Sequence, residues 1–378
     1  MTAPLSNTEH RWLKRAFKLA KNGRYTCKPN PKVGCVLVKD EQLIGQGWHH
    51  QAGQAHAEIN ALKDCALRGH LAKGATLFVT LEPCSHTGRT GPCTQAIIQA
   101  GVQRVIIGGK DPNPQVNGQG IQQLRQAGID VISDVMPKKE RKLNKGIHKR
   151  YSVGLPWVTL KLASTLDGRT AAADQSSRWI TNTQARLDVH QLRLMNDAVL
   201  TGVNTILTDD PQLNARLEGS HFSIHPIVQP QVVVLDSALN TPTSAKILAH
   251  NPWIIASQTK ADPSRKRMLE QHGATIHQLP SADRLNLKKA LNRLADHNIN
   301  SVLVEAGATL SGALLSAGLV DELILYLAPS LLGSESQPLL HLPSIQSITD
   351  KHELKLNKLV QLQDNIKLTL SSQLSYTS

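Results

Sequence analysis

The chain has 378 residues, of which 40% are hydrophobic and 19% charged, a balance typical of a folded protein of about two domains and not of a disordered or coiled-coil chain. Aromatic residues make up only 3%, which argues against binding of single-stranded nucleic acid on rows of stacked rings. The formal net charge of +13 favours an anionic partner, and a nucleic acid, a membrane surface and a phosphorylated metabolite all fit.

The first part of the chain alternates helical and strand patterns. Apolar residues within 6–22 recur with the i, i+3, i+4, i+7 spacing of a core-facing helix, which we prefer to a presequence. The next strands are expected at 33–38, 43–48, 75–80, 104–107 and 129–132, with helices starting near 57, 92 and 120. The basic run 137–156 has helical spacing and ends in Gly-Leu-Pro, so we interpret it as a solvated helix face and place the domain boundary there.

The second part shows the same α/β alternation. Strands are expected at 157–163, 198–202, 232–236, 253–256, 301–305 and 322–328, and helices at 183–194, 264–271 and 285–296. The segments 354–362 and 366–371 alternate like a closing hairpin around Asp364-Asn365. No stretch reaches the roughly 18 consecutive apolar residues of a membrane span.

The strongest chemical signal is His56-Ala57-Glu58 followed by Pro83-Cys84 and Pro92-Cys93. One imidazole and two thiolates leave a zinc ion a fourth position for water, whose pKa the metal lowers towards about 7, so that hydroxide forms at neutral pH. Glu58 is not needed as a ligand and can carry protons, the role that zinc deaminases give to the Glu of H-x-E. The side chains of His56 and Glu58 can reach the same metal ion only where a helix begins, because positions i and i+2 lie roughly 200° apart within a helix.

The other three cysteines, Cys27, Cys35 and Cys65, lack partners at ligand spacing and are interpreted as small core residues. Five cysteines make an odd count, which argues against a disulfide framework and predicts a reducing, cytoplasmic location.

With these motifs, the whole chain resembles the bifunctional deaminase-reductase family of riboflavin biosynthesis. Eight residues separate Cys84 from Cys93, whereas cytidine-deaminase-like enzymes have P-C-x-x-C, and this long loop is the family's mark. Gly91 stands where the family usually has Pro. The motif Pro29-Asn30-Pro31-Lys32-Val33-Gly34 also matches. The resemblance implies substrate contacts from Asn30, His49, His86 and Arg89, while we interpret the motif 111–114 as turn chemistry.

Four blocks, 161–171, 176–181, 201–216 and 304–315, resemble the family's reductase domain, with Thr165 where Ser is usual. The resemblance implies a cytidine-deaminase-like three-layer domain over 1–146 and a dihydrofolate-reductase-like α/β domain over 150–374. It implies that the following residues face NADPH: Trp179, Thr205, Asp209, Gly307, Ala308, Thr309, Leu310, Ser311, Gly312 and Ala313. It also implies that these bind substrate: Lys161, Ser177, Arg193, Arg216 and Glu305.

The hypothesis is therefore a cytoplasmic enzyme that uses zinc hydroxide to convert 2,5-diamino-6-(5-phosphoribosylamino)pyrimidin-4-one into 5-amino-6-(5-phosphoribosylamino)uracil and then reduces the ribosyl to a ribityl side chain with NADPH. This hypothesis includes no nucleic-acid partner and no membrane partner, and it allows a homo-oligomer. Lys161 and Asp209 both remain candidates for the proton path of the reductase.

Two alternatives remain. A nucleic-acid base deaminase with an accessory domain would use the same zinc chemistry, but it predicts a short Cys spacing. A structural zinc site would require a fourth protein ligand, for which His86 is the nearby candidate.

Overall fold

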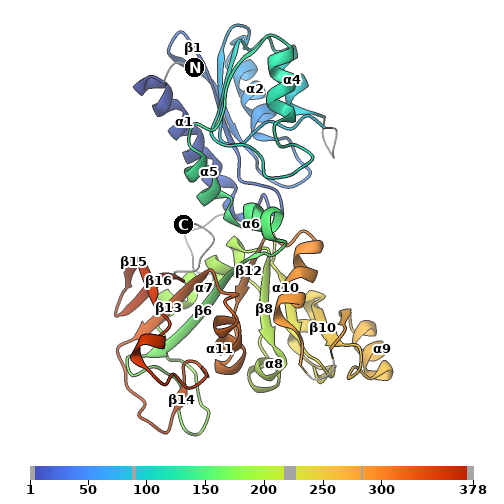
Figure 1. The fold of residues 1–378 in the computed structure, drawn as a ribbon, viewed down its shortest axis with the longest axis vertical. Coiled ribbons are helices and arrows are strands. Elements are labelled where there is room, and N and C mark those ends of the chain that lie inside the picture. The colour runs from blue at the N-terminus through green and yellow to red at the C-terminus, as the bar shows by residue number, and fades with distance from the viewer. Residues whose placement is uncertain (1–4, 87–90, 217–226, 282–283, 373–378) are drawn as a thin grey trace. The chain divides into compact units, whose positions relative to one another are not determined.

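The computed structural model describes residues 5–86, 91–216, 227–281 and 284–372 (Figure 1). Its contacts divide the chain into two compact units, one ending at Val153 and one beginning at Gly154; residues 227–228 group with the first. No helix among these described residues is long and apolar enough to cross a membrane.

The first unit is built around a five-stranded sheet in the order β2-β1-β3-β4-β5. The strands are β1 Gly34–Lys39, β2 Gln42–Trp48, β3 Thr76–Val79, β4 Arg104–Ile107 and β5 Asp130–Ile132. β1 runs antiparallel to both β2 and β3, whereas β3, β4 and β5 are parallel. The helices are α1 Asn7–Ala20, α2 Ala57–Leu67, α3 Cys93–Gln99, α4 Gln119–Gln126, α5 Pro137–Leu143 and α6 Lys145–Val153, with a 3-10 turn over Lys21–Tyr25.

Helices cover both faces of this sheet, which makes three layers. On one face, side chains of α2, α3 and α4 share a core with alternate residues of the strands, among them Leu37 and Val105. On the other face, α1 packs its predicted apolar stripe, including Phe17, against Val36 and Phe78. The alternation of side chains along a strand explains why one strand serves both cores.

Two glycines allow α2 to lie directly on β2. A side chain on Gly45 or on Gly47 would bring its Cβ within 2.5 Å of the Ala61 backbone of that helix. The close approach fixes the N-terminal end of α2, where His56 is the N-cap residue.

The interpretation of the run 137–156 as a solvated helix face is correct only in part, because residues such as Lys138, Arg141 and Lys142 are exposed but others are buried. Its first part forms α5 and α6, in which Glu140 is 1% exposed and Asn144 2% exposed. α5 lies beside α1 (Figure 1), and the Lys139 ammonium lies 4.8 Å from the Phe17 ring centroid. The Lys and Arg residues dominate the composition of this run, which hides the buried side of the two helices.

The second unit contains a nine-stranded sheet in the order β11-β10-β9-β8-β12-β6-β13-β16-β15. The strands are β6 Trp157–Thr165, β8 Ala198–Gly202, β9 Gln231–Leu235, β10 Trp253–Ser257, β11 Thr275–Leu279, β12 Ser301–Val304, β13 Glu322–Ala328, β15 Leu354–Leu362 and β16 Asn365–Ser372. Pairings from β11 to β13 are parallel, and β16 and β15 complete the sheet as the expected antiparallel hairpin. A separate small sheet pairs β7 Arg169–Ala171 with β14 Gln337–Pro338.

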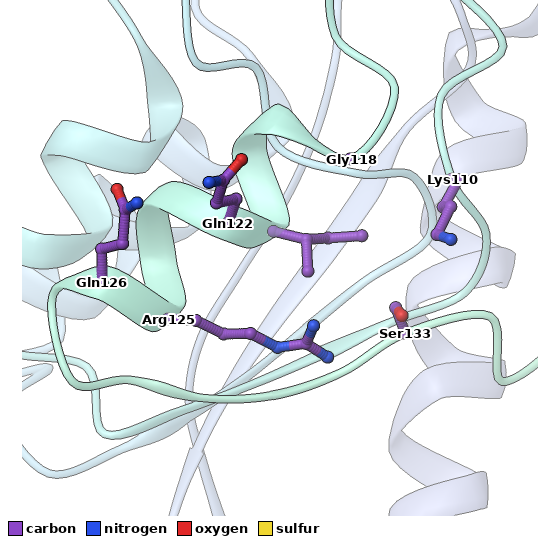
Figure 2. Close-up of a pocket in the computed structure, with 7 residues that line it drawn as sticks. Lys110, Gly118, Gln122, Arg125, Gln126 and Ser133 are labelled. Carbon is purple, nitrogen blue, oxygen red and sulfur yellow. The ribbon is translucent and has the colours of Figure 1, made fainter.

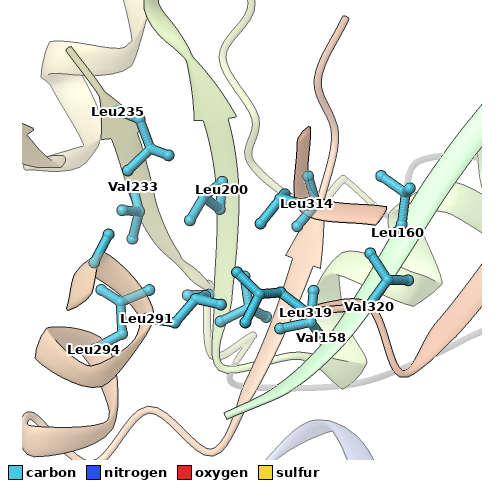
Figure 3. Close-up of a cluster of buried hydrophobic side chains, with 14 of the residues drawn as sticks. Val158, Leu160, Leu200, Val233, Leu235, Leu291, Leu294, Leu314, Leu319 and Val320 are labelled. Atoms are coloured by element: carbon cyan, nitrogen blue, oxygen red, sulfur yellow. The ribbon is translucent and has the colours of Figure 1, made fainter. Parts of the chain in front are cut away.

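Helices again pack on both faces. The helices are α7 Thr183–Met195, α8 Val203–Asp209, α9 Pro263–Gln271, α10 Leu287–Asp296 and α11 Ala308–Ser316, with 3-10 turns over Lys246–His250 and Ile348–Asp350. Figure 3 shows the core on one face, where Leu291 and Leu294 of α10 and Leu314 of α11 meet strand residues such as Leu160 and Leu200. On the opposite face, α7 covers Ile324 and Tyr326 of β13.

Candidate active sites

The structure brings His56, Cys84 and Cys93 together in the first unit. His56 immediately precedes α2 and its side chain makes no capping hydrogen bond, Cys93 opens α3, and Cys84 lies in the segment after β3. His56 Nδ1 lies 3.2 Å from Cys93 Sγ and 3.6 Å from Cys84 Sγ. Since N···S edges in a tetrahedral zinc site measure about 3.5 Å, these three donors fit a zinc ion.

The group leaves room for a fourth, non-protein ligand. Among the described residues, the potential ligand atoms that lie within 4.8 Å of one another come from His56, Cys84 and Cys93. His86, the fourth ligand that a structural site would require, is exposed and is not one of this group. The geometry therefore favours a catalytic over a structural zinc site.

Hydrogen bonds prepare Cys84 as a thiolate. The Cys93 side chain, His56 and the Cys93 backbone N–H, whose nitrogen lies 3.4 Å from Cys84 Sγ, together lower the pKa of Cys84 well below its ordinary value despite its burial, whereas the shared hydrogen bond and burial raise the pKa of Cys93. A thiolate is the form of cysteine that binds a metal.

Glu58 lies in the first turn of α2 and is only 3% exposed. Burial raises its pKa to about 7, while the positive charge of His56 opposes this shift. A carboxyl group whose pKa lies near the working pH can both accept and return a proton, which is what a deamination requires of it.

Asn30 and His49 lie next to these donors. Asn30 Nδ2 is 3.1 Å from His49 Nε2, and His49 Nδ1 is 3.1 Å from the Ala55 carbonyl oxygen, so the imidazole donates to Ala55 and accepts from Asn30. The His49 ring meets the His56 ring edge-on, with 5.2 Å between centroids. Burial lowers the pKa of His49, which keeps the ring neutral. Arg89 lies outside the described residues.

Replacing Cys93 by Ser should cost the protein its zinc. An alcohol is a far poorer zinc ligand than a thiolate, so we expect zinc affinity to fall about 100-fold or more. Metal analysis after dialysis against a chelator measures this. Cys65→Ala is the matched control, because Cys65 is an equally buried residue of α2 outside the group. Full zinc retention in Cys93→Ser, or equal zinc loss in the control, would count against the assignment.

A second site lies in the second unit, as a pocket of about 540 Å³ at the carboxyl ends of β8 and β12. Ligands commonly bind at the carboxyl ends of parallel strands. Nine of the predicted residues line it: Lys161, Ser177, Arg193, Thr205, Asp209, Glu305, Gly307, Ala308 and Thr309.

Arg193 and Glu305 form a preformed ion pair in this pocket. Arg193 Nε lies 2.6 Å from Glu305 Oε1 and its Nη2 2.9 Å from Oε2, while Nη1 donates to the Asn214 carbonyl oxygen at 2.8 Å. Their side chains are only 12% and 11% exposed. Their contact with a sugar phosphate stays a prediction, and in the present geometry all three guanidinium nitrogens have partners.

Lys161 of β6 lies beside this pair. Burial lowers the pKa of its ammonium, although the nearby Glu305 carboxylate opposes the shift. Lys161 and Ile324 are paired across β6 and β13, so both side chains point to the face that α7 covers.

The other predicted residues of this half do not line the pocket. Trp179 is 70% exposed, with the Arg186 guanidinium 4.5 Å above its ring, and Arg216 is also exposed. Residues 310–313 belong to α11 itself. There Ser311 Oγ donates to the Ala306 carbonyl oxygen at 3.1 Å, which is a structural role in this geometry.

The sequence reasoning missed one wall of the pocket, the segment from Gln337 to His341. It reaches the pocket because β14 pairs with β7 and because His341 contacts α11, whose Gly312 would clash with the His341 carbonyl oxygen if it carried a Cβ. No motif marks the segment, since its position depends on pairing with a distant strand.

A smaller groove in the first unit borders α4, with a volume of about 450 Å³ (Figure 2). Both cations at its border already have partners. Arg125 donates to the Val131 carbonyl oxygen at 3.1 Å, and Lys110 lies 3.6 Å from Asp134. We assign this groove no role.

Comparison with known proteins agrees with both sites. Residues 6–109 match the family described as "Cytidine and deoxycytidylate deaminase zinc-binding region", and residues 156–368 match the "RibD C-terminal domain". The three-layer deaminase domain and the dihydrofolate-reductase-like domain are thereby confirmed, and the chain is a bifunctional enzyme that joins a zinc deaminase to a reductase.

Relatives that match over nearly the whole chain identify the family of this enzyme. The riboflavin biosynthesis protein RibD of Escherichia coli is 43% identical over 372 residues, which cover 95% of this chain and 98% of the relative. A crystal structure of Acinetobacter baumannii RibD is 42% identical with a TM-score of 0.88, covering 97% of this chain and 99% of that one. The deaminase/reductase of Thermotoga maritima is 31% identical, with a TM-score of 0.82 and coverage of 97% and 99%. The chain belongs to the RibD family of riboflavin-biosynthesis deaminase-reductases.

Proposed function

We propose that the first unit hydrolyses the 2-amino group of 2,5-diamino-6-(5-phosphoribosylamino)pyrimidin-4-one, below called the diaminopyrimidine. The product, 5-amino-6-(5-phosphoribosylamino)uracil, is the compound named in the Thermotoga maritima reductase. Below it is called the aminouracil. The observation that carries the proposal is the zinc-ligand group together with buried Glu58 and with the Asn30–His49 pair, whose imidazole contacts His56.

In the proposed mechanism, His56, Cys84 and Cys93 would hold zinc, and the bound ion would supply an activated water molecule for attack on the ring carbon. Glu58 takes one proton from the attacking water and delivers it to the ring nitrogen. It then takes the second proton, from the hydroxyl group now on the ring carbon, and delivers it to the departing amino group. Asn30 presents its amide to the pyrimidine edge, and neutral His49 holds this amide in place through the 3.1 Å hydrogen bond. Ammonia is the leaving group, and the oxygen of water becomes the new carbonyl oxygen.

We propose further that the second unit uses NADPH to reduce the ribosyl group of the aminouracil to a ribityl chain. The cofactor supplies the hydride when bound, and the protein supplies position and a proton. Thr205, Asp209, and Gly307 with the first two residues of α11 line the pocket and would face the cofactor. Lys161 lies beside the reacting carbon, and its ammonium is one candidate proton source, with Asp209 the other.

This proposal is tested by assaying the zinc-loaded full-length protein with the diaminopyrimidine, with the aminouracil and with tRNA. We expect ammonia from the diaminopyrimidine alone, and oxidation of NADPH with the aminouracil. Ammonia from tRNA would favour a nucleic-acid base deaminase, which the family match leaves without support. A rate with NADH equal to that with NADPH would contradict the choice of cofactor. The cytoplasmic location stays a prediction.

Replacing Lys161 by Met should slow the reduction and spare the deamination. Met retains the length of the side chain but removes the ammonium, so we expect the kcat for NADPH oxidation to fall about 100-fold. The control is Lys266→Met on α9, where the ammonium lies 4.0 Å from Glu270 and outside the pocket. Unchanged reduction in Lys161→Met would exclude Lys161 from the proton path.

A further inference from the structure

The buried face of α5 and α6 contacts the segment that carries Asn30, and the proposed mechanisms assign this contact no role. Asn144 lies between the two helices, is 2% exposed, and falls outside the segment 6–109 that matches the deaminase family. Its side chain bonds to the main chain of Lys32, a residue that is distant in sequence but belongs to the Pro29–Gly34 motif that carries Asn30.

Both polar atoms of the Asn144 amide are used in this contact. Its Oδ1 accepts from the Lys32 backbone N–H at 2.8 Å, and its Nδ2 donates to the Lys32 carbonyl oxygen at 3.1 Å. The side-chain amide thus pairs with one residue of main chain as a neighbouring strand would. Two hydrogen bonds to the same residue fix both the position and the rotation of its peptide units.

Glu140 and His148 hold the amide in turn. Asn144 Nδ2 also donates to Glu140 Oε1 at 3.0 Å, and His148 Nε2 lies 2.5 Å from Glu140 Oε2. These residues follow one another at intervals of four, so they share one side of the α5–α6 segment. Because the carboxylate engages the Nδ2 atom, the amide cannot flip without losing the bonds to Lys32.

The loop that contains Lys32 also carries Asn30, the residue proposed to contact the pyrimidine. Asn30 is two residues away, and its backbone N–H donates to the Cys27 carbonyl oxygen at 2.9 Å within the same loop. Its side chain bonds to His49, whose ring contacts the zinc ligand His56. The Lys32 contact therefore ties this loop to the α5–α6 segment.

We infer that Asn144 is a positioning residue of the deamination: it places the Asn30 amide against the pyrimidine by holding the Lys32 main chain. The inference deepens the proposed function and rests on its assignment of Asn30. A shift of about 1 Å in an orienting group can cost about 100-fold in rate, so a loop anchor of this kind affects catalysis without touching substrate.

A double-mutant cycle on the zinc-loaded full-length protein tests it, with kcat/KM for ammonia release from the diaminopyrimidine as readout. We expect Asn30→Ala to lower kcat/KM about 100-fold and Asn144→Ala about 10-fold. The double variant should lose about 100-fold and not about 1,000-fold, because Asn144 acts only through Asn30. Zinc content and reductase activity should stay at wild-type levels.

Val131→Ala supplies the matched control. Val131 is a buried residue of β5, at the edge of the same sheet and separated from β1 by two strands, so its truncation loosens the unit without reaching the loop. Its effect should add to that of Asn30→Ala. If Asn144→Ala lowers zinc content or reductase activity, the cycle is run with Asn144→Ser, which shortens the side chain but places no second carboxylate beside buried Glu140.

The outcomes separate the two ideas. An unchanged kcat/KM in Asn30→Ala overturns the proposed substrate contact and the inference together. A fall in Asn30→Ala with fully additive loss in the double variant leaves the substrate contact standing and overturns the role of Asn144. Non-additive loss, together with additive behaviour of Val131→Ala, supports positioning through the loop.

Discussion

Glu58→Gln should abolish ammonia release from the diaminopyrimidine, with a fall in kcat of about 1,000-fold or more. Gln has nearly the same shape as Glu but cannot take up a proton from water and return it to the ring. The carboxyl group is 3% exposed, and burial raises its pKa above the ordinary value, which favours uptake of a proton at this position. Ammonia assays on the zinc-loaded variant measure the effect.

Two internal comparisons make this result specific. Zinc content should be unchanged, since Glu58 is not one of the three ligands. NADPH oxidation with the aminouracil should also continue, because the reductase pocket is lined by residues of the second unit. Glu9→Gln serves as the control and should keep both activities; Glu9 is a half-buried residue in the first turn of α1, and its carboxylate accepts from the Ser6 N–H. Equal loss of both activities in Glu58→Gln would contradict two independent sites.

Arg193→Met should destabilise the second unit by about 3–5 kcal/mol and remove its reductase activity. The substitution leaves the Glu305 carboxylate, only 11% exposed, without the two short hydrogen bonds that now compensate its burial. Burial by itself would raise the pKa of Glu305, and the Arg193 guanidinium holds it below its ordinary value. The variant should therefore take up a proton at Glu305 or open the pocket.

Hydrogen exchange at the β6 and β12 amides measures this unit separately from the first. The double variant Arg193→Met with Glu305→Leu should recover most of the lost stability, since replacing both members of a buried ion pair by apolar residues is often tolerated. It should not recover the reduction, because the charges of Arg193 and Glu305 are gone from the pocket. Equal stability of the single and the double variant would show that the unpaired Glu305 carboxylate does not cause the loss, and wild-type stability of the single variant would show that the pair contributes little.

The sequence was enough to predict the zinc site because its chemistry depends on local spacing. His56 and Glu58 can approach one metal ion because a helix begins between them. The two Pro-Cys pairs can approach it because they flank a single loop. The periodicity of apolar residues likewise predicted α1 and most of the long strands. The hairpin of β15 and β16 was also predicted, with its turn one residue earlier, at residues 363–364.

Other features depended on contacts between distant segments. β11 is a short edge strand whose centre reads Ile-His-Gln, without the apolar alternation of the central strands, and it was missed. α8, which was also missed, is seven residues long and buries only Ile206. The pairing of Arg193 with Glu305 joins positions that are 112 residues apart, and nothing in either local sequence indicates it.

The run 137–156 shows the limit most clearly. Its positive charges predict a solvated surface, and the buried acceptors Glu140 and Asn144 are hidden among them. Only the three-dimensional structure shows that Asn144 meets Lys32, because that contact requires α5 to lie beside α1 and the start of β1.

The central claim is that one chain deaminates a pyrimidine and then reduces the sugar of the product. It is tested most directly by giving the wild-type, zinc-loaded protein the diaminopyrimidine together with NADPH and following ammonia and NADPH in the same sample. Ammonia should appear first, NADPH oxidation should follow after a lag, and the two amounts should become equal. NADPH oxidation without prior ammonia release would contradict the account.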